Sequence, residues 1–192
     1  MPKRTPLYIG IAVGVALALA CVGYFLFQKN SASNAAGNVF AAAGDASTSA
    51  SIASGQAQPP PNSKDYQNAR YHFFLYYPDD LSVSEEPVSA NSLVVLFKDA
   101  AKQEGFEVFV TAYDQPTITQ QRFLIDEPSG VMLDPAYITV DGAPATEFLS
   151  TNPAMGASRE IWFLRDGILY EVTAPQPLDS WLLQIMETWQ FI

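Results

Sequence analysis

The sequence predicts an α+β domain, an antiparallel β-sheet covered by helices, preceded by one transmembrane helix. Short aromatic and β-branched segments separated by turn residues fill residues 65–192 and indicate strands. Two Asp-Gly dipeptides, each between two such segments, indicate tight hairpins and therefore antiparallel neighbours. Apolar residues at three- and four-residue spacing near the C-terminus indicate an amphipathic helix. Strands and helices do not alternate one by one, which argues against a parallel sheet.

Residues 7–27 form an apolar run of 21 residues without a charged side chain. A bilayer core about 30 Å thick is crossed by about 20 apolar residues in a helix, and a helix satisfies all its backbone polar groups within lipid. The run therefore predicts one transmembrane helix or signal anchor. Lys3 and Arg4 precede it, and basic flanks stay on the cytoplasmic side. We expect residues 1–6 inside the cell and the C-terminal domain outside the cytoplasm.

Two other interpretations of this segment stay open. Ala18 and Ala20 resemble the small residues of a signal-peptide cleavage site, and Cys21 resembles the lipid-modified cysteine of a bacterial lipoprotein. All three interpretations place the domain outside the cytoplasm. Cys21 is the only cysteine, so an intramolecular disulfide is excluded, and the domain offers neither a cysteine nucleophile nor a cysteine ligand for zinc.

Residues 28–64 consist mainly of Ala, Ser, Gly, Asn, Gln and Pro. Such a composition buries too little apolar surface to offset the entropy of ordering the chain. We expect a flexible linker, which as a random coil of 37 residues spans about 35 Å. Residues 65–192 are rich in aromatic and β-branched side chains, and their number suits one domain with one core.

The predicted domain begins with three strands. Residues 71–77 are apolar on both faces, which indicates a central strand, and residues 78–80 (Pro-Asp-Asp) indicate a turn after it. Residues 93–98 form a second apolar strand. Residues 106–113 alternate between apolar and other side chains, and the face expected to point into the core carries Phe106, Val108, Val110 and Ala112.

Two hairpins are predicted in the second half of the domain. The first covers residues 137–149 around Asp141-Gly142, and the second covers residues 159–173 around Asp166-Gly167. Asp-Gly suits the tight primed turns that match the twist of the flanking strands.

Two helices are predicted to cover the sheet. The first spans residues 117–125, because Thr117 and Gln120 have the spacing of a capping box. The second lies near the C-terminus, where apolar side chains recur at helical spacing. Its apolar positions are Leu178, Trp181, Leu182, Ile185 and Trp189. We expect Phe191 and Ile192, which follow, to tuck into the core.

Several short motifs of the domain occur in the same order in a known family. They are Phe74-Leu75-Tyr76-Tyr77-Pro78, Phe97-Lys98-Asp99, the Val-Asp-Gly-Ala-Pro-Ala turn at 140–145, Asp166-Gly167-Ile168-Leu169-Tyr170, and the segment from Trp181 to Phe191. With these motifs residues 66–192 resemble the PsbP family. Its plant members are extrinsic subunits of photosystem II, and its fold also occurs in a Ran-binding protein and in bacterial membrane-anchored proteins.

The resemblance implies an α/β/α sandwich. The motifs are turns, core aromatics and a helix end, so the resemblance implies no functional residue and no photosystem role. The chain departs from the family at Leu81, where members often have Trp, and its anchor and linker replace the N-terminal region of the plant members.

His72 is the only histidine, and its neighbours Tyr71 and Phe73 place it in the middle of an apolar strand. We expect it to be structural rather than a catalytic base, because the sequence has no G-x-S-x-G motif for a Ser-His-Asp triad. A zinc site with several imidazoles is excluded by the single histidine.

Carboxylates offer the alternative chemistry. A glycosidase needs two carboxyl groups about 5–9 Å apart across a cleft, and Asp79, Glu85, Glu107 and Asp134 are the first candidates. The abundance of oxygen ligands makes calcium the best metal, but an EF-hand-like Asp-x-Asp-x-Asp-Gly loop is missing. We therefore assign no catalytic, cofactor-binding or metal-binding residue.

The domain is acidic. Residues 64–192 hold 19 of the 20 acidic residues and seven of the ten Lys and Arg, which gives a net charge of −12. Nucleic acid is excluded as a partner, because its phosphates need cationic side chains. The simpler interpretation is an acidic surface that keeps the domain soluble, and the more specific one is that this surface binds a basic partner.

Trp162, Trp181 and Trp189 occupy positions in the apolar patterns of their segments and are expected in the core. Exposed aromatic side chains would instead indicate a platform for sugars or peptides.

These observations predict a single-pass membrane protein of the bacterial envelope with an extracytoplasmic PsbP-like domain. The expected role is a non-enzymatic binding or accessory module of an envelope complex, with the membrane and an envelope protein as partners and no cofactor. A carboxylate-based envelope hydrolase and an aromatic-groove ligand-binding domain are the alternatives.

Overall fold

The structure is a computed structural model that describes residues 59–99, 101–102, 104–127, 130–152 and 156–192. The predicted membrane segment at 7–27 and nearly all of the predicted linker lie outside the described residues. No helix in the described part of the chain is both long enough and apolar enough to cross a bilayer.

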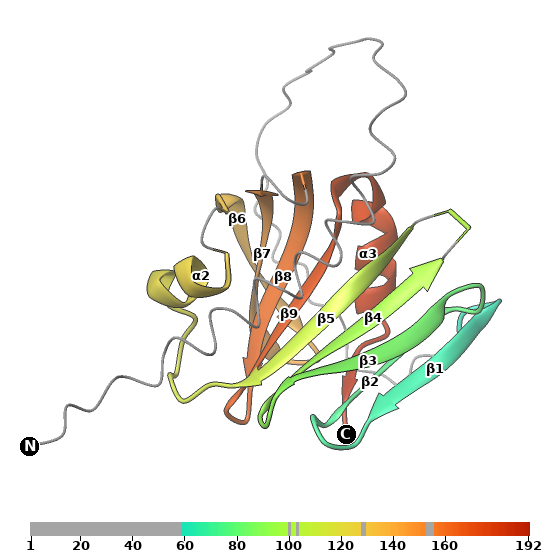
Figure 1. Cartoon of the computed structure of the whole chain (residues 1–192), viewed down its shortest axis with the longest axis horizontal. Helices are drawn as coiled ribbons and strands as arrows, with labels where there is room; N and C mark the ends of the chain where they lie inside the picture. The colour runs from blue at the N-terminus through green and yellow to red at the C-terminus, as the bar shows by residue number, and fades with distance from the viewer. Residues whose placement is uncertain (1–58, 100, 103, 128–129, 153–155) are drawn as a thin grey trace, which may run out of the picture.

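A seven-stranded antiparallel sheet forms the centre of the domain (Figure 1). Its strands, in spatial order, are β3 (Ser82–Ser89), β4 (Ser92–Asp99), β5 (Glu104–Ala112), β9 (Ile168–Pro175), β8 (Gly156–Arg165), β7 (Ala143–Asn152) and β6 (Leu133–Val140). The order contains two meanders, β3–β5 and β6–β9, in which strands adjacent in sequence are adjacent in space. The pairing of β5 with β9, which sets Val108 opposite Val172, joins the two meanders into one sheet.

A second, three-stranded antiparallel sheet has the order β1 (Ser63–Asn68), β2 (Phe73–Pro78) and β10 (Gln190–Phe191). It brings the first and last strands of the domain together, because both pair with β2. The backbone N–H of Phe191 also donates a 2.8 Å hydrogen bond to Oδ2 of Asp141, in the turn between β6 and β7. The C-terminus is thus fixed to both sheets.

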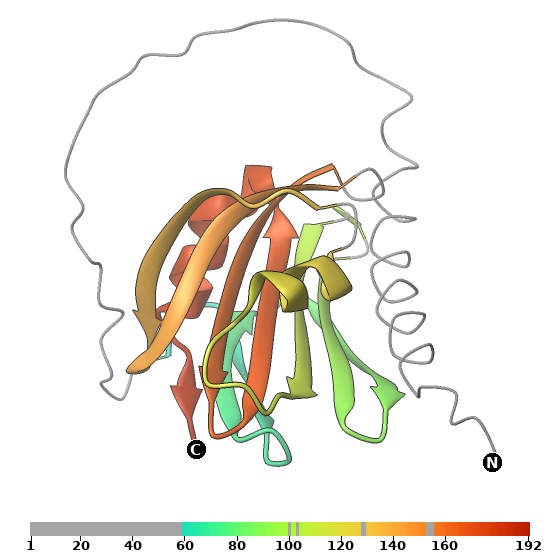
Figure 2. The ribbon, with the colours of Figure 1, turned by 90° about the vertical axis from the view of Figure 1, so that its left-hand side faces the viewer.

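Two short α-helices lie on opposite faces of the large sheet (Figure 2). Helix α2 (Gln120–Asp126) lies in the connection between the two meanders. Helix α3 (Asp179–Met186) follows a 3₁₀ turn, η1 (Gln176–Leu178), after β9. The face opposite α2 is covered by α3 together with the small sheet, so the outer layer there is only partly helical.

The main core lies between the large sheet and the layer of α3 and the small sheet. Phe73 and Leu75 of β2 and Leu182 of α3 are completely buried there. Phe73 stacks on Trp189, with ring centroids 4.6 Å apart and planes 3° from parallel. Burial of these large apolar side chains is the main stabilising contribution to the fold.

The predicted antiparallel class, the strands near 93–98 and 106–113, and both Asp-Gly hairpins are confirmed. Asp141 and Gly142 have φ of 42° and 78°, and Asp166 and Gly167 have φ of 51° and 77°. Positive φ at both central positions is the mark of the type I′ turn, which Asp-Gly favours and which fits twisted strands.

Four predictions are wrong in detail. Ile192 is 51% exposed rather than tucked into the core. His72 precedes β2 in an exposed position with φ of 54°, rather than lying inside the strand. The cap of α2 is Thr119, not Thr117: its hydroxyl accepts a 3.1 Å hydrogen bond from the backbone N–H of Arg122. Helix α3 ends at Met186, so Trp189 reaches the core from the segment after the helix.

Strands β1 and β3 were not predicted. Both are edge strands, β1 of the small sheet and β3 of the large one. Most side chains of β3 are exposed, and its middle carries Glu85, Glu86 and Pro87. Charges and proline are typical of edge strands that resist pairing with other chains, and they remove the apolar alternation by which strands are recognised.

Candidate functional site

The face of the large sheet that carries α2 has an apolar part and an acidic part. Phe123 of α2 contacts the apolar part, with its ring centroid 5.6 Å from those of both Phe148 on β7 and Trp162 on β8. Ile118, just before the helix, packs against the same cluster. Phe123 and Asp126 are the buried residues of the helix, so α2 meets the sheet through one aromatic ring and one carboxyl group.

Three buried glutamates form the acidic part of the sheet face. They are Glu107 on β5, Glu160 on β8 and Glu171 on β9, and each is less than 7% exposed. Thr173 of β9 is paired in register with both Glu107 and Glu160, which places these two glutamates in one row across the sheet. Glu171 lies two residues along β9 from Thr173, on the same face. We call Glu107, Glu160, Glu171 and Asp126 the carboxyl cluster.

Glu160 is the best hydrogen-bonded member of the carboxyl cluster. It accepts from the Ser158 hydroxyl at 2.7 Å, the Thr173 hydroxyl at 2.6 Å and Trp162 Nε1 at 3.3 Å. Burial, followed by the negative charge of Glu127, raises the pKa of Glu160 to about 8, although the three hydrogen bonds lower it. Desolvation therefore outweighs hydrogen bonding at this position.

Glu107 has fewer partners. Its Oε2 atom is buried without a hydrogen bond. Burial, followed by the negative charges of Glu127 and Glu86, raises its pKa to about 8. A buried carboxyl with an unpaired oxygen is more stable in the neutral form, because an isolated buried charge costs far more than an isolated buried dipole.

Arg122 of α2 is the cation that contacts the carboxyl cluster. Its Nε donates to Oδ2 of Asp126, one turn along the helix, and its Nη2 lies 3.9 Å from Oε1 of Glu171. Burial, followed by the charge of Asp126, raises the pKa of Glu171 well above its usual range. Burial also raises the pKa of Asp126, while Arg122 lowers it. We infer that Asp126 carries the charge that balances Arg122 and that Glu171 is neutral.

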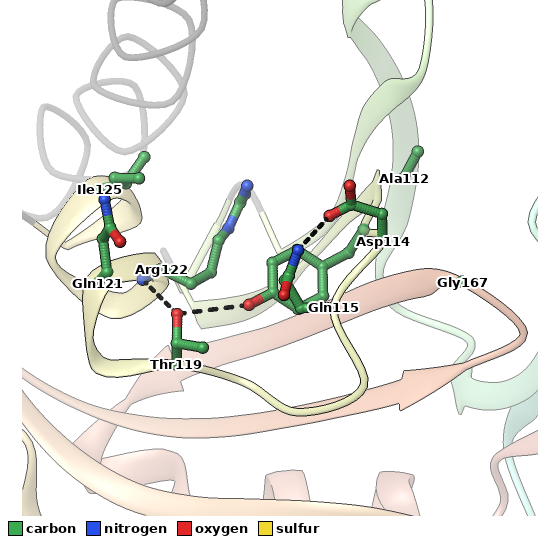
Figure 3. A pocket seen from close by; sticks show the side chains of 9 residues that line it. Ala112, Asp114, Gln115, Thr119, Gln121, Arg122, Ile125 and Gly167 are labelled. Carbon is green, nitrogen blue, oxygen red and sulfur yellow. Dashed lines mark hydrogen bonds between the residues drawn. The ribbon is translucent and has the colours of Figure 1, made fainter.

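A hollow of about 740 Å³ opens beside α2, between the helix and the segment after β5 (Figure 3). In this view Arg122 and Gln121 extend from the helix, and Asp114 and Gln115 lie across from them. The guanidinium of Arg122 lies over the ring of Tyr113, 5.6 Å from its centroid. The polar groups here bond mainly to one another: Gln115 Nε2 donates to Asp114 Oδ1 at 3.0 Å, for example.

An apolar groove of about 620 Å³ lies on the other flank of α2, toward β6 and β7. Aromatic side chains line it, namely Phe123, Tyr137, Phe148 and Trp162. Around it, exposed apolar side chains come from α2 and from the segment that enters β6, with Leu124 53% and Tyr137 83% exposed. We call the exposed apolar side chains that line the groove the α2–β6 rim, and they are Leu124, Val131, Met132 and Tyr137. Ile125 lines the hollow on the other flank of α2, and Leu133 pairs with Leu149 on the opposite face of the sheet.

The structure does not bring the four candidate carboxylates together. Asp79 lies in the turn after β2, and Asp134 is exposed on β6. Glu85 on β3 accepts a 2.7 Å hydrogen bond from the Tyr66 hydroxyl of the small sheet, whereas Glu107 is buried on the opposite face of the large sheet, with α2. Among the described residues, no group of three or more His, Cys, Asp or Glu is arranged to hold a metal ion.

Sequence reasoning missed three members of the carboxyl cluster, Asp126, Glu160 and Glu171. A signal was present, because Glu160 directly precedes the apolar run 161–164 and Glu171 lies between the apolar residues Tyr170 and Val172. The prediction that the tryptophans belong to the core is confirmed for Trp162 and Trp189, which are buried. Trp181 is partly buried and meets Phe106 edge to face, with centroids 5.7 Å apart.

No protein-family model matches the chain, and no curated protein matches it. Among solved structures, the chain is similar to cyanobacterial PsbP from Synechocystis sp. PCC 6803, with a TM-score of 0.52 and 9% sequence identity. The similarity covers 73% of this chain and 99% of the other. The domain therefore has a PsbP-like fold, and at this identity the similarity shows the fold alone.

Proposed function

We propose that the chain is a single-pass membrane protein whose PsbP-like domain lies outside the cytoplasm and serves as a non-enzymatic binding or accessory module of an envelope complex. The observation that carries this proposal is the α2–β6 rim. Four of the seven large apolar side chains exposed in the described residues, at positions 124, 131, 132 and 137, line one groove. Contiguous exposed apolar side chains mark interaction surfaces, whereas scattered ones are ordinary.

The charge of the domain suggests the chemistry of the partner. The net charge of −12 for residues 64–192 disfavours other acidic surfaces. A partner that offers an apolar patch with basic residues around it would gain from burial at the rim and from electrostatic steering.

The state of the carboxyl cluster supports a role without catalysis by carboxylates. Glu107, Glu160 and Glu171 are buried beneath α2, where they cannot reach a substrate. The exposed candidates Asp79 and Asp134 lie on different elements, and Glu85 bonds to Tyr66. A hydrolytic pair needs two facing carboxyl groups in an open cleft.

Crosslinking from the rim tests the docking role. A photoreactive amino acid in place of Met132, in the full chain in its native membranes, should give a defined adduct with one envelope protein. Leu124→Glu and Val131→Glu should each reduce the adduct at least about tenfold, because a charge at a desolvated apolar contact is costly. Ile192→Glu is the matched control, since Ile192 is 51% exposed but lies outside the rim. An adduct that survives both rim substitutions contradicts the proposal.

Membrane topology has its own test. The full chain should stay with membranes after alkaline extraction, and a C-terminal tag should be accessible only from outside the cell. Release of the chain by Cys21→Ser would indicate lipoprotein anchoring instead. Recovery of the tagged chain in the cytoplasmic fraction would refute the localisation.

A second function, ligand binding, is favoured by the aromatic lining of the groove. Tyr137, which is 83% exposed, offers a ring face to an apolar or sugar-like ligand, and the buried rings of Phe148 and Trp162 form the floor of the groove. Titration with candidate ligands, followed by tryptophan fluorescence, should then respond in wild type and lose its response in Tyr137→Ala.

A further inference from the structure

We propose that α2 is a movable cover over the carboxyl cluster and that it stays on the sheet while the buried carboxyl groups are neutral. The α2–β6 rim is then complete at acidic pH and comes apart as the pH rises. This inference rests on the proposed function in one respect, namely that the regulated surface is the docking rim. The device itself is a property of the isolated domain and is testable without a partner.

The contact between α2 and the sheet is small. The helix has seven residues, and Phe123 is its only buried apolar side chain. Thr119 caps the helix at one end, and Ile118 adds a partly buried contact. A helix this short is not stable by itself in water, so its position depends on what lies beneath it.

Charged and titratable groups face the underside of α2 from each neighbouring strand that carries one. β5 supplies Glu107, β8 supplies Glu160 and β9 supplies Glu171, while the helix and its end supply Arg122, Asp126 and Glu127. Glu86 of the edge strand β3 contributes negative charge at Glu107, and Lys98 of β4 lies farther along the same face of the sheet. The ring of Tyr113 contacts Arg122 at the rim of the hollow. Acidic groups therefore outnumber the cations.

Geometry allows one ionised carboxyl group to be balanced in the cluster. Arg122 forms its ion pair with Asp126 and lies 3.9 Å from Glu171. Further ionisation leaves buried negative charge without a partner, for example at Oε2 of Glu107, which has no hydrogen bond. The cost of such a charge exceeds what one buried ring provides, so the charged state favours displacement of α2 into water.

The direction of the pH effect follows from the raised pKa values. Glu107 and Glu160 have pKa values of about 8 when buried and about 4.5 when exposed to water. Glu107 and Glu160 therefore bind protons more tightly when α2 lies on the sheet than when it is displaced. The stabilisation of α2 by these groups is complete below about pH 4.5 and is lost progressively as the pH rises to about 8.

Displacement of α2 divides the rim. Leu124 belongs to the helix, whereas Tyr137 belongs to β6. The groove between them is also lined by Phe123, which leaves with the helix. Protonation thus controls whether the two halves of the apolar surface are adjacent.

Hydrogen exchange of the full chain in detergent, corrected for intrinsic rates, tests the proposal. The amides of Phe123 and Glu127 donate within α2, to the carbonyls of Thr119 and Phe123. We expect their protection factors to fall at least about tenfold between about pH 5 and pH 8.5, while those of β4 and β9 remain well above those of α2 at every pH. In Glu107→Gln/Glu160→Gln the fall should be less than about threefold, because the neutral amides do not ionise.

Glu104→Gln/Glu187→Gln, which removes two exposed carboxylates, is the matched control and should behave as wild type. If the Glu107/Glu160 variant does not fold, the single variants Glu107→Gln and Glu160→Gln replace it, and each should show a smaller fall than wild type. Three outcomes would each refute the proposal that α2 is a cover. The protection of α2 in wild type could stay constant with pH, it could fall equally in the neutral variant, or the whole sheet could lose its protection together with α2. A failure of rim crosslinking with intact pH-dependent exchange would refute the docking role and leave the cover standing.

Discussion

The Thr173 hydroxyl of β9 donates a 2.6 Å hydrogen bond to Oε2 of Glu160, its directly paired neighbour on β8. Glu160 is 1% exposed, so water cannot replace a lost donor. We expect Thr173→Val to lower the free energy of unfolding by about 1–3 kcal/mol, because it keeps the β-branched shape and removes the hydroxyl. Thr173→Ser should recover most of the loss. Urea denaturation measures both variants, and a Thr173→Val domain as stable as wild type would contradict the assigned role.

The carboxyl cluster predicts an unusual dependence of stability on pH. Burial raises the pKa values of Glu107 and Glu160 to about 8. The folded domain therefore holds protons that the unfolded chain releases from about pH 4.5 upward, and its free energy of unfolding should fall by a few kcal/mol between about pH 5 and pH 8. In Glu160→Gln the decline should be shallower, as judged by urea denaturation at several pH values. A profile in Glu160→Gln as steep as in wild type would show that Glu160 does not titrate in this range.

Phe123 is predicted to hold α2 on the sheet. Its ring meets those of Phe148 and Trp162, and the side chain is buried. Phe123→Ala should cost about 3 kcal/mol and change the fluorescence of Trp162, because the substitution removes the apolar seat of the helix. Leu124→Ala, next to it but exposed, should change stability by less than about 0.5 kcal/mol. Equal effects of the two substitutions would mean that α2 is not seated through Phe123.

Arg159 links the large sheet to the start of α3. Its Nε and Nη2 donate to the two carboxylate oxygens of Asp179 at 2.7 and 2.9 Å. Arg159→Lys keeps the charge but loses the paired geometry, and it should cost about 1 kcal/mol, since the pair is only partly shielded from solvent. Arg165→Lys is the control, because its 3.2 Å contact with Asp166 is exposed. Thermal or urea unfolding measures the loss of stability in each variant. Equal losses in Arg159→Lys and Arg165→Lys would contradict this prediction.

How much of this fold the sequence predicts depends on how local the signals are. Asp141-Gly142 and Asp166-Gly167 dictate their turns through their own backbone preferences, so both hairpins were predictable. The pairing of β5 with β9 joins residues about 60 positions apart, so no local signal in the sequence predicts it. Strand β3 could not be recognised, because an exposed edge strand needs no apolar alternation.

The candidate site was less predictable than the fold. Glu107 was selected as a possible catalytic group, but its neighbours Glu160 and Glu171 come from strands that pair only in the tertiary structure. Burial of a carboxyl group is a property of packing, which periodicity does not report at a polar position. The rim was also hidden, because Leu124 and Tyr137 are unremarkable in sequence until the fold places them around one groove.

The two Asp-Gly hairpins allow a matched test of how the C-terminus is held. Both aspartates have positive φ, but only Asp141 accepts a hydrogen bond from the C-terminal strand, at 2.8 Å from the backbone N–H of Phe191, whereas Asp166 accepts one from its neighbour Arg165. Asp141→Ala removes the turn preference and the acceptor, whereas Asp166→Ala removes the turn preference and an exposed ion pair. We expect Asp141→Ala to be more destabilising by about 1 kcal/mol.

Hydrogen exchange separates the two contributions in these variants. Protection of the Phe191 amide should drop in Asp141→Ala and stay at the wild-type value in Asp166→Ala, because only the first variant removes the acceptor. Asp141→Asn should preserve most of the protection, since asparagine tolerates positive φ and keeps a side-chain oxygen. If the Phe191 amide is equally protected in all three variants, the pairing of β10 with β2 is sufficient to hold the C-terminus, and the contact with Asp141 is incidental.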